Sequence, residues 1–331
     1  MKKTVITYII ILSALCACGA RSKKTETAGA AAAAPCGPAF NADSAYSFCA
    51  RQSEFGPRTM NSSAHDACGA WIAEKFRQYG MAVTEQKATL RGFDGTPLKS
   101  TNIIASYKPE RTERIMLCAH WDSRPWADND PDSANWRKPV LASNDGASGV
   151  AVMLEIARLI AGADSLAVGI DFICFDAEDW GVPRWSDAED DGNSWALGAQ
   201  HWAANPHVQG YKARFGILLD MVGGQGARFY REAFSMQYAR EVVEKVWAAA
   251  GVVGYGSYFP AEDGGMVSDD HVPVNQTAGI PTIDIIPYYP QCAESSFGPT
   301  WHTLADNMES IDRNTFQAVG QTVIQVLYSE R

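Results

Sequence analysis

The sequence has few basic residues, no CxxC cysteine pairs, no internal repeat and no long apolar run in its main part. Its 28 Lys and Arg against 38 Asp and Glu give a formal charge of −10, which argues against a nucleic-acid-binding surface. Without CxxC pairs the cysteines make a poor metal site. Without a long apolar run after the first residues, no later segment is expected to cross a membrane. The chain is 46% hydrophobic over 331 residues, which is enough for a sizeable core.

The first residues are typical of an export signal. A lysine pair precedes the apolar stretch TVITYIIILSALCA, which is too short to span a bilayer comfortably. This stretch ends in LCAC, which is similar to the cleavage box of bacterial lipoproteins. It predicts a signal peptide at 1–17, a lipid on Cys18 and a low-complexity tether at 18–39. Plain signal-peptidase cleavage near Ala20 is the alternative. In either case we expect an exported, periplasmic protein, which in the first case contacts the membrane only through its N-terminal lipid.

Six cysteines follow the lipoprotein box, at positions 36, 49, 68, 118, 174 and 292. In an oxidising compartment some of them can pair, but their connectivity does not follow from the sequence. Cys118 and Cys174 fall in predicted strands, where we expect them to be buried as small apolar side chains.

Strand patterns alternate with helical patterns along the rest of the chain. Apolar residues recur at helical spacing in 64–79, 144–163, 196–205, 234–251 and 314–328, and strand-like segments occupy 81–90, 101–107, 114–120, 168–176, 215–223 and 280–288. This alternation predicts an α/β protein, a three-layer α/β/α sandwich around a twisted, mostly parallel sheet. No linker divides residues 40–331, so we expect them to form a single domain.

Acidic residues gather where the predicted strands end. FDAEDWG, residues 175–181, places three acids in four positions directly after a buried strand, where they would repel one another if they were ionised without a cation. Ligands of open α/β sheets bind at the carboxyl edge of the strands, and other segments reach that edge with residues suited to metal binding. The candidate ligands are His120, Asp122, Asp145, Glu178, Asp179, Asp220 and His302.

Each of these residues alone has an ordinary explanation. An acid after a strand usually caps a helix or lies in a solvated turn, Asp145 could simply favour a helix dipole, and His302 could be a core histidine. Five segments that all end in such residues are better explained by a shared cation, and zinc accepts both carboxylate oxygen and imidazole nitrogen. The acid-rich segments 128–132 and 187–191 lack EF-hand spacing, and we expect them to be solvated loops, with bound calcium as the alternative.

Several motifs together resemble the zinc aminopeptidase superfamily. They are HWD (120–122), NDGASGV (144–150), FDAEDW (175–180), LLDMVG (218–223) and DDHVP (269–273), and residues 55–80 resemble the leading helix of that superfamily. The similarity runs in order over about 50–330, so it implies the superfamily's fold for the whole domain.

Within this superfamily the chain resembles the glutaminyl cyclases of the animal type and their bacterial members. The resemblance rests on FDAED followed by RWS, on SDDH with its additional Asp269, on FGPTWHT and on SWALGAQHWA. Two positions depart from the family pattern. Asp179 stands where the family usually has Glu, which shortens the reach of the side chain by one methylene, and Ser268 stands where the animal enzymes carry Gln.

The resemblance implies a zinc-dependent enzyme that converts the N-terminal glutamine of exported peptides and proteins to pyroglutamate and releases ammonia. One zinc per chain would polarise the side-chain carbonyl, a carboxylate would shuttle the proton, and aromatic rings would wall the pocket. The residues that the resemblance assigns are Asp145, Asp179 and His302 for the metal, Glu178 with Asp220 and Asp269 for proton transfer, and Trp185, Phe297 and Trp301 for the substrate pocket.

Two alternatives stay open. A non-catalytic binding ectodomain on the same fold would typically lack some ligands, and this chain lacks none that we can identify. A two-zinc aminopeptidase fits the same residue types, although Asp269 and the Trp301–His302 pair favour the cyclase. The residues that the aminopeptidase would need are His120, Asp145, Asp179, Asp220 and His302 as ligands and Glu178 as base.

Overall fold

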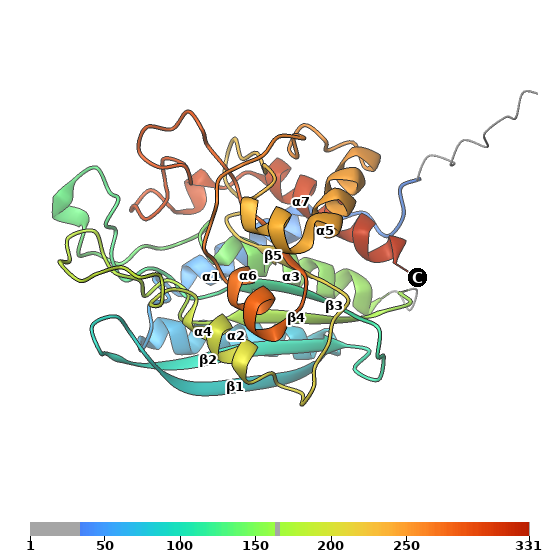
Figure 1. Ribbon diagram of the computed structural model, residues 1–331, viewed down its shortest axis with the longest axis horizontal. Helices are drawn as coiled ribbons and strands as arrows, with labels where there is room; N and C mark the ends of the chain where they lie inside the picture. Colours follow the sequence, from blue (N-terminus) through green and yellow to red (C-terminus); the bar gives the residue numbers. More distant parts are fainter. Residues whose placement is uncertain (1–33, 163–165, 331) are drawn as a thin grey trace, which may run out of the picture. The chain divides into compact units, whose positions relative to one another are not determined.

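The computed structural model describes residues 34–162 and 166–330, so the predicted signal peptide, Cys18 and most of the tether lie outside the described residues. The described chain contains one mixed six-stranded sheet in the order β1-β2-β4-β3-β5-β6 (Figure 1). Strands β4, β3, β5 and β6 run parallel to one another, whereas β1 and β2 pair antiparallel. The strands are β1 (Ala82–Arg91), β2 (Pro97–Tyr107), β3 (Arg114–His120), β4 (Gly169–Phe175), β5 (Gly216–Leu219) and β6 (Thr282–Ile285).

Helices cover both faces of the sheet. Successive residues of a strand point to opposite faces, and apolar residues on both faces need a covering layer. On β3, Ile115 and Leu117 face the core formed with α1, α2, α3, α5 and α7, whereas Met116 and Cys118 face a smaller core formed with α4 and η2. The predicted α/β/α sandwich is therefore confirmed. The helices are α1 (Ala42–Glu54), α2 (Ser63–Gln78), α3 (Ala147–Ala161), α4 (Leu197–Ala204), α5 (Ala233–Val252), α6 (His271–Pro273) and α7 (Arg313–Ser329), with short turns η1 (Ser133–Asn135), η2 (Val274–Ala278) and η3 (Met308–Ser310).

Several elements differ from the sequence prediction, and β5 and β6 are each shorter than predicted, at four residues. Helix α1, which begins after the Asn41 N-cap, was not predicted, because polar residues interrupt its apolar stripe. Strand β2 begins at Pro97, four residues before the predicted start at Thr101, where its partner β1 extends the pairing. Helix α5 contains non-helical backbone at Ala239 and therefore bends within the segment that was predicted as one helix.

The cysteines in the described part of the chain are free thiols, at 36, 49, 68, 118, 174 and 292. Cys118 and Cys174 are fully buried, as the strand pattern predicted. Among the helices of residues 34–162 and 166–330, none has the length and apolar character needed to cross a bilayer.

The carboxyl edge of the sheet brings distant segments together. His120 at the end of β3 lies opposite Phe175 at the end of β4, so the residues that follow both strands start at the same level. Helix α3 begins nearby after Gly146, whose φ of +104° favours glycine. A Cβ at this position would also lie 2.6 Å from the carbonyl oxygen of Asp122. This tight turn presents Asp145 at the sheet edge.

Candidate active site

A cavity of about 330 Å³ opens at the carboxyl edge of the sheet. It collects side chains from the ends of β4 and β5, from the turn before α3, and from the segments before α6 and before η3. Most of the predicted site residues meet there. The lining includes Asp145, Glu178, Asp220, Asp269, Phe297, Trp301 and His302.

Asp145, Asp179 and His302 form a group of three possible metal ligands. One ligand atom from each lies within 4.8 Å of the other two, and all three residues are buried. The Nε2 atom of His302 lies 3.3 Å from Asp179 Oδ1 and 3.6 Å from Asp145 Oδ2. Asp179 Oδ2 has no hydrogen-bond partner among the described residues. An unpartnered buried carboxylate oxygen beside an imidazole and a second carboxylate fits zinc, which binds this donor set and keeps a further position open.

Asp128 and Arg124 support this group from behind. Asp128 Oδ1 lies 3.5 Å from His302 Nδ1, which leaves Nε2 facing the two carboxylates. Arg124 donates two hydrogen bonds to the Asp128 carboxylate, at 2.9 and 2.7 Å, and also approaches Asp179 Oδ1 at 3.4 Å. Although burial opposes it, the Arg124 guanidinium holds the pKa of Asp128 below its usual range. A carboxylate behind a ligand histidine fixes its tautomer and orientation.

Residues 128–132 were predicted to form a solvated loop, and this prediction is wrong for Asp128 and Asp130. Asp128 is only 4% exposed and Asp130 only 8% exposed. Asp130 accepts hydrogen bonds from the backbone N–H of Leu304 and from Asn135, so it ties this loop to the segment that carries His302. Sequence reasoning missed both residues because an acid-rich run has the same composition whether it is solvated or folded inward.

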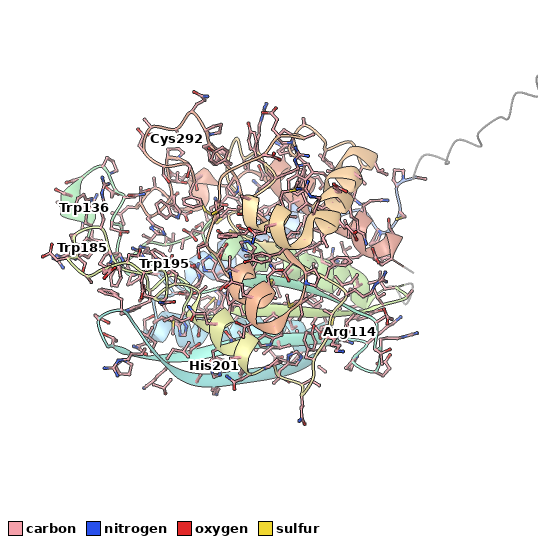
Figure 2. The ribbon with its side chains drawn as sticks, in the orientation of Figure 1. Arg114, Trp136, Trp185, Trp195, His201 and Cys292 are labelled. Carbon is pink, nitrogen blue, oxygen red and sulfur yellow. The ribbon has the colours of Figure 1, made fainter. Side chains whose placement is uncertain are left out.

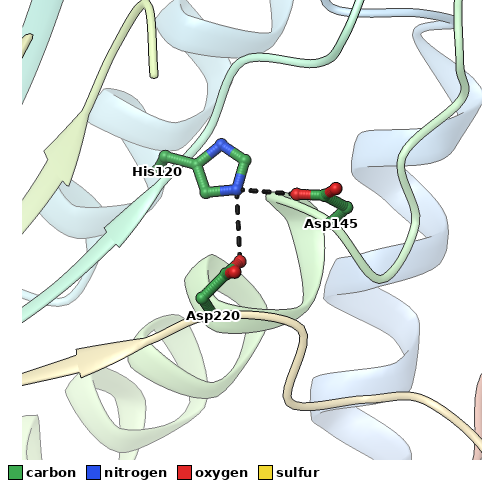
Figure 3. Close-up of side chains that lie close together, drawn as sticks. All are labelled: His120, Asp145 and Asp220. Carbon is green, nitrogen blue, oxygen red and sulfur yellow. Dashed lines mark hydrogen bonds and ion pairs between the residues drawn. The ribbon is translucent and has the colours of Figure 1, made fainter. Parts of the chain in front are cut away.

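His120 forms a second group with Asp145 and Asp220 (Figure 3). Its Nε2 atom lies 3.0 Å from Asp145 Oδ1 and 3.3 Å from Asp220 Oδ1, both within hydrogen-bonding distance. In the Asp145–Asp179–His302 group, by contrast, Asp179 Oδ2 has no partner among the described residues. The two groups share Asp145.

Asp122 and Asp306 accept hydrogen bonds from backbone N–H groups and are not metal ligands in this arrangement. The two Asp122 oxygens accept the backbone N–H groups of Glu178 and Asp179, at 3.1 and 3.2 Å. Asp306 accepts the N–H groups of Asn144 and Asp145 in the same way, at 2.7 and 3.0 Å. Asp122, a candidate ligand by sequence, is therefore used to orient the two acids that follow β4.

Glu178, Asp220 and Asp269 form the acidic floor of the cavity. Burial raises the pKa of Glu178 well above its usual range, and the neighbouring Asp179 and Asp269 add to the shift while His120 opposes it. Burial, together with Asp269, raises the pKa of Asp220 to about 8. A bound divalent cation acts in the opposite direction, since it favours ionised carboxylates. The three acids therefore titrate as a coupled group.

Aromatic rings wall the cavity, but Trp185 is not among the lining residues. Phe297 and Trp301 pack with ring centroids 4.8 Å apart, and Trp301 stacks on His302 at 3.7 Å. The third wall is Trp195, which lies parallel to His302. Figure 2 shows Trp185 in an outer loop beside Trp136.

Gly181 allows the close approach of Trp195. A Cβ at position 181 would lie 1.9 Å from the Trp195 ring, so any side chain there would displace that ring. The sequence pattern pointed to Trp185 because it follows the FDAED motif directly, and nothing in that pattern indicates that the chain folds back to bring Trp195 over the cavity.

Strained backbone surrounds the site. Ala177, Met221 and His302 are non-glycine residues with φ of 54°, 52° and 56°. Each adopts the left-handed conformation directly beside or at a site residue, which costs free energy and persists where the surrounding structure enforces it. Such strain is concentrated at functional sites in proteins.

The sequence pattern of the family described as Peptidase family M28 matches residues 102–327. Among curated proteins, the chain is 29% identical over 280 residues to aminopeptidase YwaD of Bacillus subtilis, covering 82% of this chain and 54% of that protein. It is 28% identical over 260 residues to the glutaminyl-peptide cyclotransferase of Bothrops jararaca, covering 70% of this chain and 65% of that protein. The chain thus spans between about half and two thirds of the length of these relatives.

Solved structures are more similar. The crystal structure of Bacteroides thetaiotaomicron glutaminyl cyclase bound to N-acetylhistamine matches with a TM-score of 0.87 and 52% identity, covering 89% of this chain and 100% of that one. A Zn-dependent exopeptidase from Parabacteroides distasonis matches with a TM-score of 0.87 and 49% identity, with the same coverage.

Proposed function

The chain belongs to peptidase family M28, and from this premise we propose that it is a zinc-dependent glutaminyl-peptide cyclotransferase acting on peptides and proteins with N-terminal glutamine. The observation that carries the proposal is the cavity itself. It joins an open metal-ligand group to Glu178 and to the rings of Trp195, Phe297 and Trp301. Its volume of about 330 Å³ is small for a ligand site and suits a single folded-back side chain.

The proposed reaction is intramolecular. The α-amine nitrogen of the terminal glutamine forms a bond to its own side-chain amide carbon, and the bond from that carbon to the amide nitrogen breaks. The amine gives up a proton and the departing nitrogen gains one, which releases ammonia. The aromatic walls restrict the substrate to a compact conformation in which the amine and the amide carbon are close, and this positioning supplies much of the acceleration.

Glu178 is the proposed proton carrier. It lines the cavity and is only 9% exposed, so it can accept the amine proton and deliver it to the leaving nitrogen. Its raised pKa brings it closer to the pH at which it must both take and give a proton. Asp269 is near it and Asp220 lines the same cavity, and both are proposed as partners in proton sharing.

One zinc, held by Asp145, Asp179 and His302, is proposed for each chain. Bound there, it would supply a Lewis acid for the side-chain carbonyl oxygen. The unpartnered oxygen of Asp179 supports this position. The test is metal analysis of the purified protein, for which we expect one equivalent of zinc.

The activity is tested by incubating the protein with a Gln-initiated dipeptide, with and without a chelator. We expect release of ammonia and the corresponding loss of mass from the peptide, both abolished by the chelator. A protein that holds zinc but leaves the dipeptide intact would refute the cyclotransferase.

A two-zinc aminopeptidase is the second candidate, because His120, Asp145 and Asp220 also place ligand atoms within 4.8 Å of one another. It predicts two equivalents of zinc and release of leucine from Leu-initiated peptides. Neither is expected of the cyclotransferase, so one metal analysis and one peptide assay separate the two candidates.

For localisation we propose export and lipid attachment at Cys18, which the LCAC box supports. Cells grown with labelled palmitate should label the protein and retain it in the membrane fraction. Cys18→Ser should abolish the label and release the protein from the membrane. Labelling that survives this substitution would refute the anchor.

A further inference from the structure

A group of buried polar side chains lies behind the acidic floor of the cavity. Asp269, His271 and Asp284 each place a ligand-type atom within 4.8 Å of the other two. Asp269 lines the cavity, whereas His271 and Asp284 are fully buried beneath it. Asp284 lies on β6 and His271 is the first residue of α6. The group is thus adjacent to the site but hidden from the substrate.

Asp284 has no hydrogen-bond donor to stabilise a negative charge. Its backbone N–H donates to Ser235 Oγ at 2.9 Å, but neither of its carboxyl oxygens has a partner among the described residues, and Asp269 Oδ2 has none either. An ionised carboxylate at zero exposure without a donor is very costly. One carboxyl oxygen of Asp269 and one of Asp284 lie within 4.8 Å of each other. Because an ionised carboxylate can only accept, a hydrogen bond between these two groups needs a proton on one of them.

The imidazole of His271 approaches a different carboxylate, that of Glu232. Its Nε2 atom lies 3.2 Å from Glu232 Oε2, and Glu232 also accepts backbone N–H groups from Phe234, Ser235 and Val267. Although burial opposes it, His271 and these N–H groups lower the pKa of Glu232 to about 2. The ionised Glu232 therefore lies against the Nε2 side of the imidazole.

The other groups that face Asp284 are acidic or neutral, so they favour a proton on it. Burial, Asp269 and Asp220 raise the pKa of Asp284 well above its usual range. The titratable groups around Asp284 are Asp220 after β5, Glu232 at the start of α5, Cys118 on β3, and Asp269, Asp270 and His271 around the start of α6.

We propose that Asp284 is held protonated and donates its O–H to Asp269, so that it is a positioning residue for the Asp269 carboxylate in the proton transfers around Glu178. Asp284 itself touches no substrate, and its proton is not consumed in the reaction. With one oxygen fixed by the N–H of Asp270 and the other by Asp284, Asp269 is held in one orientation beside the cavity. The role of Asp284 in proton transfer rests on the proposed cyclotransferase activity. Its protonation and its hydrogen bond to Asp269 do not.

The test compares Asp284→Asn with Asp284→Leu in the zinc-loaded full chain. The amide N–H of Asn still donates to Asp269, so we expect kcat within about threefold of the original and an unchanged pH profile. Leu removes the donor, so we expect kcat to fall about 10–100-fold, the loss for one hydrogen bond to a charged group. We also expect the acidic limb of kcat/KM to move to higher pH, because Asp269 then ionises less readily.

Infrared spectroscopy gives a readout that does not depend on activity. The difference spectrum between the original protein and Asp284→Asn at neutral pH should contain the carbonyl stretching band of one buried carboxylic acid. An unchanged band would overturn the proposal, even if the chain proved not to be a cyclotransferase. An Asp284→Asn variant that is as impaired as the Leu variant would also overturn it, because that outcome means that Asp284 is ionised.

Loss of a second metal equivalent in Asp284→Asn would assign the group to a cation instead. Should the Leu variant not fold, the Asn variant and the infrared band decide the question.

Discussion

Glu178 and Asp179 are adjacent in the chain, yet the structure gives them different surroundings. Asp179 approaches His302 and Arg124, whereas Glu178 lines the cavity near Asp269. The left-handed Ala177 and the two hydrogen bonds that Asp122 accepts from their backbone N–H groups fix both residues in this arrangement. Two carboxylates of similar chemistry can therefore serve as metal ligand and proton carrier.

Glu178→Gln tests this division of roles. Gln keeps the shape of the side chain but cannot carry a proton, so kcat should fall by about 10²–10⁴-fold. Zinc content should stay at the original value, as measured by metal analysis of the same preparation. The exposed Glu189→Gln in the neighbouring loop is the control and should be fully active. Loss of zinc in Glu178→Gln would mean that the roles of Glu178 and Asp179 are exchanged.

Asp128→Asn tests the support behind His302. The amide holds the imidazole less firmly than the carboxylate does, and zinc affinity should fall about 10–100-fold. Competition with a chelator of known affinity measures the change. The control is the exposed Asp187→Asn, which should bind zinc as tightly as the original protein. Equal affinity in Asp128→Asn would show that His302 is oriented by other contacts.

Among the elements, helix α5 depends on an unusual N-cap. Glu232 accepts the N–H groups of Phe234 and Ser235 while it also contacts His271, so one carboxylate joins the start of α5 to α6. A negative charge at a helix N-terminus is favourable, and here it is only 2% exposed with a paired imidazole. The result is a pKa of about 2, against 4.5 for an ordinary Glu.

This pKa predicts how stability depends on pH. Because the pKa of Glu232 is lower in the folded chain, its contribution is fully present above about pH 4.5 and is lost as the pH falls towards 2. Glu232→Gln should therefore lower the free energy of unfolding by about 3 kcal/mol at pH 7. The difference from the original protein should shrink below pH 4.5. Urea unfolding at several pH values measures it, and a difference that stays constant with pH would refute the assignment.

At the scale of the whole molecule, the site exists only when the sheet edge is assembled. Its metal-ligand group draws on the start of α3, the end of β4 and the segment around residue 302, which are far apart in the chain. Without a cation, the buried carboxylates Asp145 and Asp179 repel each other. Metal binding and folding should therefore be coupled.

Removal of the metal should lower thermal stability. A ligand present at 100 times its Kd stabilises the folded state by about 2.7 kcal/mol, which corresponds to a shift of roughly 5–10 °C in Tm for a domain of this size. Calorimetry before and after chelation measures the shift, and added zinc should restore the original Tm. His302→Ala, which lacks a ligand, should show a much smaller response to the chelator.

The sequence by itself determined the sheet, the layers and the chemical types at its edge. Long apolar strands that alternate with amphipathic helices leave little choice of architecture, and an acid directly after such a strand must lie at the carboxyl edge. For this reason the strand pattern alone predicts that His120, Asp179 and Asp220 lie close to one another. The expected reaction came from the resemblance of the motifs around Glu178 and His302 to those of the glutaminyl cyclases.

Only the tertiary structure decided which side chains face inward from the loops. Asp128 is buried against His302, Trp195 rather than Trp185 covers the cavity, and Asp284 lies beneath Asp269. Each of these placements depends on how a loop folds back or how two elements pack, and such contacts join residues with no shared periodicity in the sequence. Strand and helix patterns arise from local spacing, whereas the partner of a buried charge is set by the packing of the whole domain.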